Sequence, residues 1–195
     1  MSAGVDAEVA QRYAHLHADA VAVLECWPAP DAAQDALRHA YLEHLRAHPD
    51  AVSRDGPPVH LTASCLVLSA DGEHALLTHH RRAGEWFQFG GHLEVSDSCL
   101  WSAARREARE ESGIDGLDPL PRPVHLDRHV LAGDFGRCRE HLDVRYAAVA
   151  PPGARTRVSG ESLDVRWWPV GDLPDGTRAE LAPLVSLARG VLGHR

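Results

Sequence analysis

The chain has 195 residues, 44% of them hydrophobic and 25% charged, as expected for one folded globular domain with an extra element. The formal net charge of -8 argues against sequence-independent binding to a nucleic-acid backbone, because such binding needs a basic surface. No run of about 18 apolar residues and no secretory signal pattern is present, so no membrane partner is expected. The four cysteines are far apart and form no CxxC pair. We therefore expect reduced thiols and a cytoplasmic protein.

Two helices are expected in the first third of the chain. Apolar side chains recur at steps of three and four over residues 6–26, and Trp27-Pro28-Ala29-Pro30 ends this helix. The second helix is predicted to begin at Asp31, its N-cap, and to stop before Pro49. The two together predict a helical hairpin.

Two histidines on the second helix need an interpretation. His44 and His48 are four residues apart, a spacing that can grip a metal, but no acidic or cysteine partner is in register. A solvated polar face is therefore preferred. The turn-rich stretch Ser53–Pro58 is the expected linker. We predict a helical extension and linker over residues 1–58, followed by a second domain over residues 59–195.

Short strands dominate the chain after this linker. Asp71-Gly72 is a hairpin signal between two strand-like runs, and Gly133-Asp134-Phe135-Gly136 is expected to join two later strands. The pattern predicts a mixed α/β protein of the α+β type, with mostly antiparallel strands and at least one helix on each side. The expected strands are Thr62–Ser69, His74–His79, Trp86–Phe89, Val124–Leu131, Glu140–Ala150 and Leu163–Val170, followed by a closing helix over Leu181–Leu192.

The central helix has signals at both ends. Asp97 or Ser98 is the expected N-cap, and no proline or glycine interrupts the segment from there to Ser112. Gly113 is the expected left-handed C-cap, and Ile114 supplies the hydrophobic contact after it.

Three glutamates give this helix its chemistry. Glu107, Glu110 and Glu111 lie at i, i+3 and i+4, so their carboxylates project from one face. A solvated acidic stripe paired with nearby arginines is the alternative interpretation. The preceding Gly90-Gly91 turn favours a ligand site, because glycines let the backbone approach a ligand closely. Clustered oxygen ligands are what Mg²⁺ or Mn²⁺ requires.

The segment resembles the Nudix box, the signature of the Nudix hydrolase family. Arg106-Glu107-Ala108-Arg109-Glu110-Glu111-Ser112-Gly113-Ile114 matches the second half of the box in full. The first half departs from it: with Gly91 as the box glycine, Asp97 stands where glutamate is usual, and one extra residue separates Asp97 from Arg106. The resemblance extends from Leu61 to about Leu192 in the order of elements.

The resemblance implies a Nudix-like mixed sheet sandwiched between helices, here with an N-terminal helical extension. It also implies that Glu107, Glu110 and Glu111 hold Mg²⁺ or Mn²⁺, that the Gly91 carbonyl is a further ligand, and that Arg106 orients the carboxylates. The cation would bridge diphosphate oxygens and lower the pKa of an attacking water. The general base could come from the box or from a later loop, where Glu161 is the candidate and an ordinary exposed acid is the alternative.

Other side chains could line a substrate pocket. His141 and Asp143 alternate along one strand, and this polar line either edges the pocket or forms a solvated face. The aromatic residues before the glycines could stack on a nucleobase, although core packing is their more common use. The predicted substrate contacts are Arg82, Trp86, His92, His129, His141 and Asp143.

The resemblance implies hydrolysis of a diphosphate bond in a nucleoside diphosphate linked to another moiety, so the expected partner is a small molecule. A Nudix-like nucleotide sensor that does not hydrolyse its ligand is one alternative. An isoprenoid diphosphate isomerase on the same fold is another, for which Cys99 offers no evident acid–base partner. Residues 1–58 could form a homodimer contact or a lid.

Overall fold

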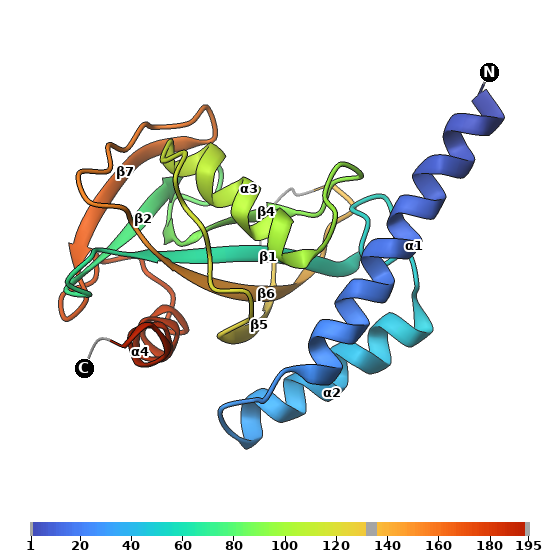
Figure 1. Cartoon of the computed structure of the whole chain (residues 1–195), viewed down its shortest axis with the longest axis horizontal. Helices are drawn as coiled ribbons and strands as arrows, with labels where there is room; N and C mark the ends of the chain where they lie inside the picture. The colour runs from blue at the N-terminus through green and yellow to red at the C-terminus, as the bar shows by residue number, and fades with distance from the viewer. Residues whose placement is uncertain (1, 132–135, 194–195) are drawn as a thin grey trace. The chain divides into compact units, whose positions relative to one another are not determined.

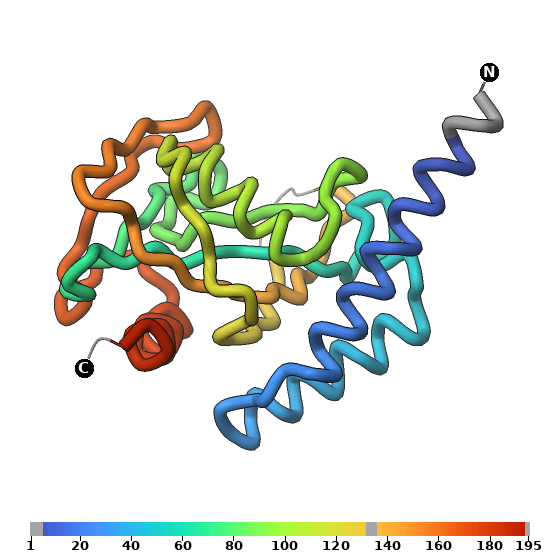
Figure 2. The backbone as a smooth tube through the Cα atoms, viewed as in Figure 1, coloured from blue at the N-terminus to red at the C-terminus, as the bar shows by residue number. Residues whose placement is uncertain are grey.

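The computed structural model describes residues 2–131 and 136–193 (Figure 1). The predicted connection through Gly133, Asp134 and Phe135 lies outside the described residues. Figure 2 traces the backbone from end to end. The elements in chain order are α1 (Ser2–Cys26), α2 (Ala32–Ala47), β1 (Val59–Leu68), β2 (His74–His80), β3 (Trp86–Phe87), β4 (Phe89–His92), α3 (Leu100–Ser112), β5 (His125–Val130), β6 (Glu140–Val149), β7 (Ser162–Pro169) and α4 (Leu181–Leu192).

The elements agree closely with the predicted ones. Asp31 is the N-cap of α2, and its side chain accepts a hydrogen bond from the amide of Gln34. The hairpin between β1 and β2 turns at Gly72, whose φ of 72° lies in the left-handed region that glycine adopts readily. The strand expected before the Gly-Gly pair is divided into β3 and β4 around Gln88. No helix in the described part of the chain is both long and apolar enough to cross a membrane.

Seven strands among the described residues belong to one sheet. Their order is β3-β2-β1-β6-β5, with β4 also paired to β1 and β7 also paired to β2. The β1–β2 pair is antiparallel, with Val67 opposite Leu76, and β7 runs antiparallel to β2 with Trp167 opposite Leu76. The sheet and its helices confirm the predicted α+β class.

The chain forms two compact units. The first unit comprises Met1–Ala63, His92–Ala103 and Leu126–Val144, and the second comprises Ser64–Gly91, Ala104–His125 and Arg145–Arg195. Each unit is assembled from three separate stretches of sequence. The expected boundary between residues 58 and 59 remains a prediction.

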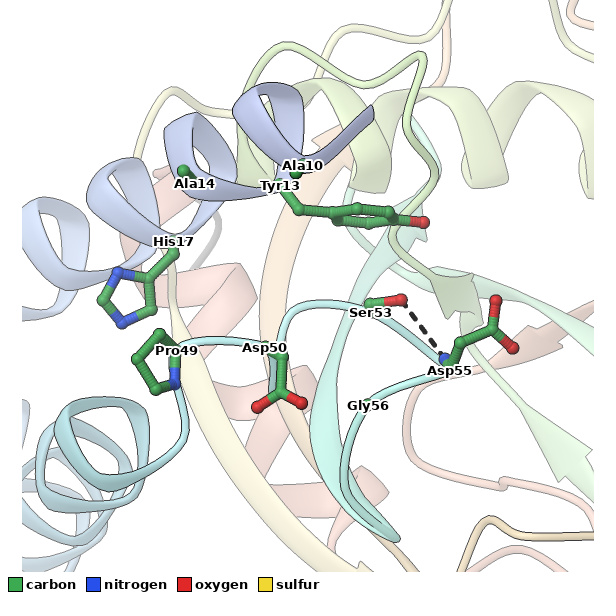
Figure 3. A pocket seen from close by; sticks show the side chains of 9 residues that line it. All are labelled: Ala10, Tyr13, Ala14, His17, Pro49, Asp50, Ser53, Asp55 and Gly56. Carbon is green, nitrogen blue, oxygen red and sulfur yellow. Dashed lines mark hydrogen bonds between the residues drawn. The ribbon is translucent and has the colours of Figure 1, made fainter. Parts of the chain in front are cut away.

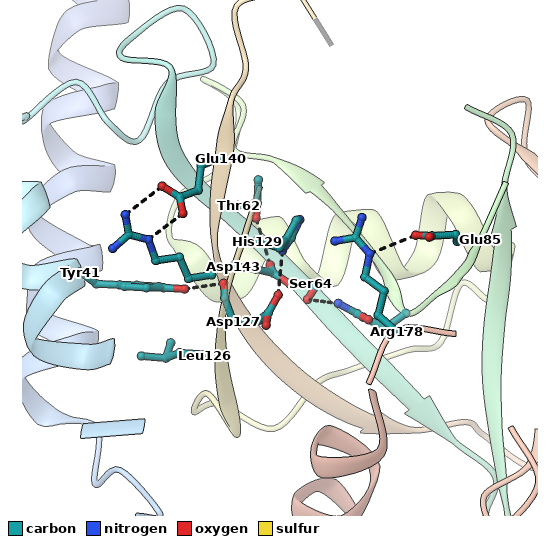
Figure 4. Close-up of polar contacts among 12 residues, drawn as sticks. Tyr41, Thr62, Ser64, Glu85, Leu126, Asp127, His129, Glu140, Asp143 and Arg178 are labelled. Carbon is teal, nitrogen blue, oxygen red and sulfur yellow. Dashed lines mark hydrogen bonds and ion pairs between the residues drawn. The ribbon is translucent and has the colours of Figure 1, made fainter. Parts of the chain in front are cut away.

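In the first unit, hydrogen bonds from α2 hold the helical hairpin against β5. The Gln34 side chain accepts a hydrogen bond from the amide of Leu126 at 2.7 Å and donates one to the Leu126 carbonyl at 3.0 Å. The Tyr41 hydroxyl donates to the carbonyl of Asp127 (Figure 4). The predicted helical extension is therefore joined to β5 by hydrogen bonds from Gln34 and Tyr41.

The predicted N-cap of α3 is wrong. Helix α3 begins at Leu100, later than expected, and the Asp97 carboxylate accepts a hydrogen bond from the amide of Glu94 at 2.8 Å instead. The amide of Leu100 donates to the carboxylate of Asp19, which lies on α1, at 2.8 Å. Asp19, 81 positions earlier in the chain, thus accepts a hydrogen bond from a backbone amide that has no partner within the helix. The sequence around Leu100 gives no sign of this contact.

In the second unit, α4 packs against one face of the sheet. Leu184, Val185 and Ala188 of this helix form one buried cluster with Leu66 of β1 and Leu77 of β2. Figure 1 shows the later turns of α3 on the opposite face of the sheet from α4. The predicted sheet between helices is therefore confirmed.

Candidate active site

The three glutamates of α3 differ sharply in exposure. Glu111 is 6% exposed, and the side chain of Glu107 is 15% exposed. The Glu110 side chain is 62% exposed. Burying two neighbouring carboxylates in their charged form destabilises the folded state, unless a proton or a cation neutralises them. A solvated acidic stripe does not fit Glu107 and Glu111.

The Gly-Gly loop lies directly against these carboxylates in the second unit. The amide of Gly90 donates a hydrogen bond to Glu111 Oε2 at 3.0 Å. A Cβ atom placed on Gly91 would lie 2.6 Å from Glu107 Oε1 and 2.9 Å from its Cδ. Only glycine fits at Gly91 without displacing the Glu107 carboxylate, as expected for a backbone that approaches a ligand site.

Arg106 links two of the three glutamates. Its Nη1 donates to Glu107 Oε1 at 2.9 Å and to Glu110 Oε2 at 3.3 Å. The neighbouring Arg105 and Arg109 pair with Asp118 instead, at 2.8 and 3.1 Å. Arg106 is therefore the arginine of α3 that is placed to orient the carboxylates.

Burial changes the acid–base behaviour of Glu107 and Glu111. Burial raises the pKa of Glu107 to about 7, and the charge of Arg106 opposes this rise. Burial raises the pKa of Glu111 to about 8, and the charge of Glu107 adds to the rise. Without a cation, both carboxyl groups hold protons that an exposed glutamate would lose near pH 4.5. The environment of Glu107 and Glu111 therefore favours a bound proton or a neutralising cation over two bare negative charges.

Glu161 is within electrostatic reach of this pair. Its charge is among the causes that raise the pKa of both Glu107 and Glu111, after burial. The residue is exposed and directly precedes β7, and its carbonyl accepts a hydrogen bond from the amide of Arg81 at 3.0 Å. The charge of the predicted loop glutamate therefore acts on both buried box carboxylates.

Arg82 and His80 belong to the same electrostatic neighbourhood. Burial lowers the pKa of His80, the charge of Glu161 opposes this, and the charge of Arg82 adds to it. The Arg82 side chain is exposed. The charges of Arg82 and Glu161 therefore both act on His80, in opposite directions.

Trp86 packs among other rings of the second unit. It stacks on His79 with ring centroids 5.0 Å apart and meets the edge of Trp168 at 5.3 Å. It also lies against the apolar cluster under α4. The nearby Phe89 is fully buried. The contacts agree with core packing, and a substrate contact by Trp86 remains a prediction.

The other predicted substrate contacts lie in the first unit. The rings of His92 and His141 are 5.1 Å apart, and those of His129 and His141 are 5.4 Å apart. Asp143 accepts a hydrogen bond from the Thr62 hydroxyl at 3.1 Å (Figure 4). Asp143 is 3% exposed, so the solvated-face interpretation of this strand is wrong.

The structure adds two residues that sequence reasoning missed. His60 and Cys138 meet His92 and His141, although the four positions are spread over 82 residues of the chain and show no common motif. Only strand pairing and the turn before β6 bring them together. No local spacing signal could have identified them.

A separate hollow in the first unit lies between α1 and the loop after α2 (Figure 3). Tyr13 and His17 of α1 line it on one side, and Asp50 and Ser53 line it on the other. None of the predicted site residues is among its lining residues.

The end of α3 gives a test of the box geometry. Gly113 has a φ of 72°, and a Cβ there would lie 2.5 Å from the Cβ of Arg157. We expect Gly113→Ala to lower the free energy of unfolding by about 2–4 kcal/mol, from backbone strain and overpacking together. Gly153→Ala is the matched control, because Gly153 has a φ of 73° with open space around it. Gly153→Ala should lower the free energy of unfolding by about 1 kcal/mol, from backbone strain alone. Urea unfolding measures both variants, and an equal loss in the two would contradict the packing part of the prediction.

The fold is that of the Nudix hydrolases, and comparison with known proteins agrees with it. The NUDIX domain model matches residues 58–188, so the chain belongs to the Nudix family, as the box predicted. It is a Nudix-type pyrophosphohydrolase. No curated protein matches the chain.

Several solved structures are similar to this chain. A Nudix-family hydrolase from Clostridium perfringens is 25% identical, with a TM-score of 0.55 over 68% of this chain and 97% of that one. An Ap4A hydrolase from C. elegans is 18% identical, with a TM-score of 0.56 over 68% and 97%. The E. coli dihydroneopterin triphosphate pyrophosphohydrolase is 15% identical, with a TM-score of 0.53 over 70% and 96%. The last two show likeness of fold alone.

Proposed function

We propose that the chain hydrolyses a diphosphate bond in a nucleoside diphosphate linked to another moiety, with Mg²⁺ or Mn²⁺ as cofactor. The observation that carries the proposal is the burial of Glu107 and Glu111 against the Gly90-Gly91 loop, with Arg106 as their cationic neighbour. Ionised carboxylates that are shielded from water destabilise the folded state. A bound divalent cation would offset that destabilisation.

The donor set fits a hard cation. The three glutamates provide carboxylate oxygens, and the absence of a Cβ at Gly91 leaves its backbone beside Glu107. Oxygen donors of this kind are the ones that Mg²⁺ and Mn²⁺ prefer. Glu107, Glu110, Glu111 and the Gly91 carbonyl would hold the ion. Bound there, it would polarise the diphosphate oxygens and lower the pKa of a water molecule.

The remaining side chains have distinct roles in this proposal. Arg106 orients Glu107 and Glu110 through its two hydrogen bonds. Glu161, exposed and electrostatically coupled to the buried pair, accepts the proton from water as general base. Arg82 receives the phosphates of the substrate, and the ring of Trp86 remains a candidate contact for the base.

A substrate screen with chromatographic detection of the nucleotide products tests the proposal with the purified full chain. The substrates are nucleotide sugars, ADP-ribose, dinucleoside polyphosphates such as Ap4A, dihydroneopterin triphosphate and damaged nucleoside triphosphates, each with Mg²⁺ and with Mn²⁺. Cation-dependent cleavage of a diphosphate bond supports the proposal. Tight nucleotide binding without product after long incubation would favour the sensor alternative, and conversion of isopentenyl diphosphate would favour the isomerase. The same proposal includes a cytoplasmic location and a small-molecule partner, with homodimer formation through residues 1–58 as a further point to test.

The raised pKa values predict how pH affects the metal-free protein. The folded state keeps protons on Glu107 and Glu111 up to about pH 7 and 8, whereas the unfolded chain loses them near pH 4.5. The folded state then binds more protons, so the free energy of unfolding falls as pH rises from about 4.5 to 8. Mg²⁺ binds the ionised carboxylates, so it should raise Tm more at pH 8 than at pH 5. Thermal unfolding with and without Mg²⁺ measures this, and an equal shift at both pH values would contradict it.

A further inference from the structure

Three imidazole rings and one thiol converge in the first unit. His60 comes from β1, His92 from the end of β4, and His141 from β6, while Cys138 lies two residues before β6. The ring centroids of the three histidines are 5.1, 5.2 and 5.1 Å apart, which is nearly an equilateral triangle. One ligand atom from each of the four residues lies within 4.8 Å of all the others. Three donors from three strands and a fourth from the segment before β6 thus surround one point.

His60 is oriented for a ligand on its inner nitrogen. Its Nδ1 contacts the Pro57 carbonyl at 2.9 Å and, because a carbonyl only accepts, must be the protonated nitrogen. The other nitrogen, Nε2, is then an acceptor with a lone pair. It is buried and has no hydrogen-bond partner among the described residues. An outer hydrogen bond that fixes the ring while the inner nitrogen is left for an ion is typical of metal-binding histidines.

The spacing of the thiol agrees with a tetrahedral centre. Cys138 Sγ lies 3.7 Å from His92 Nε2. Ligands at about 2.3 Å for sulfur and about 2.0 Å for nitrogen, meeting at a tetrahedral angle, are about 3.5 Å apart. A simple thiol–imidazole hydrogen bond would explain this one contact. It would not explain the other two histidines or the buried Nε2 of His60.

We propose that His60, His92, Cys138 and His141 form a binding site for one Zn²⁺ ion. Three imidazoles and a thiolate are a donor set of the kind used in four-coordinate zinc sites. This chemistry differs from the carboxylate set of Glu107, Glu110 and Glu111, which suits Mg²⁺. The ion would join β1, β4 and β6 within the first unit, and its binding would release the proton of the Cys138 thiol. The inference does not depend on the proposed hydrolytic function.

Metal content and cobalt spectroscopy of the full, untagged chain test the site directly. We expect one Zn²⁺ per chain after dialysis against millimolar Mg²⁺, because the hard cation does not compete for thiolate and imidazole donors. Replacement by Co²⁺ should give the strong d–d bands of a four-coordinate ion and a thiolate-to-cobalt charge-transfer band. Less than stoichiometric Zn²⁺, or a Co²⁺ spectrum without the charge-transfer band, would overturn the proposal.

Variants identify the ligands. Cys138→Ser should remove the charge-transfer band and weaken Zn²⁺ binding by at least about 100-fold, since even loss of an outer-shell partner costs 10–100-fold. Cys26→Ser is the matched control, because Cys26 is an exposed thiol and should leave both signals unchanged. Glu110→Gln should also leave them unchanged. If Cys138→Ser does not fold, the wild-type cobalt spectrum still decides the outcome. A charge-transfer band that survives in folded Cys138→Ser, or disappears in Cys26→Ser, contradicts the assignment.

Discussion

Replacing Glu110 by glutamine is expected to lower kcat by about 10³-fold, equivalent to about 4 kcal/mol of transition-state stabilisation. The substitution keeps the shape of the side chain but removes a charged oxygen from the proposed cation site. Glu110 is 62% exposed, and its contact with Arg106 is a surface ion pair, so the loss of stability should be within about 1 kcal/mol. Rate assays on the best substrate of the screen, with urea unfolding in parallel, measure both effects.

Glu43→Gln is the matched control for this prediction. Glu43 is an exposed glutamate on α2, away from the predicted catalytic residues in sequence, and its replacement should leave kcat unchanged. If Glu110→Gln hydrolyses substrate at the wild-type rate with Mg²⁺ bound, the assignment of the box glutamates to catalysis is wrong. A large loss of stability in Glu110→Gln would instead point to a structural role.

The helix that carries the three candidate glutamates could be predicted because its sequence signals are local. The spacing of Glu107, Glu110 and Glu111 follows from helix geometry alone, and Gly113 adopts the expected left-handed C-cap. What spacing could not show is the difference in burial between Glu110 and Glu111. Exposure depends on which face of α3 the sheet and the Gly-Gly loop cover, and these come from other parts of the chain.

The features that sequence reasoning missed all depend on long-range contacts. The helix end at Leu100 is satisfied by Asp19, which the local N-cap rules could not identify. The cluster around His60 requires three strands to pair before its donors meet. A single sequence reports periodicity within an element and turn chemistry between elements. It carries little information on which polar side chains, far apart in the sequence, are buried together in the folded protein.

Gly91→Ala is expected to lower kcat by about 100-fold while leaving the fold nearly unchanged. The new Cβ would lie 2.6 Å from Glu107 Oε1, closer than real Cβ contacts allow, so the carboxylate must move away. The obstacle is the far end of a flexible side chain, which can shift at little cost in stability. However, a displacement of about 1 Å in a catalytic group can cost about 100-fold in rate. Gly171→Ala is the control, since Gly171 has open space around it. Wild-type turnover and Mg²⁺ dependence in Gly91→Ala would show that the close approach of this loop to Glu107 does not position the catalytic carboxylate.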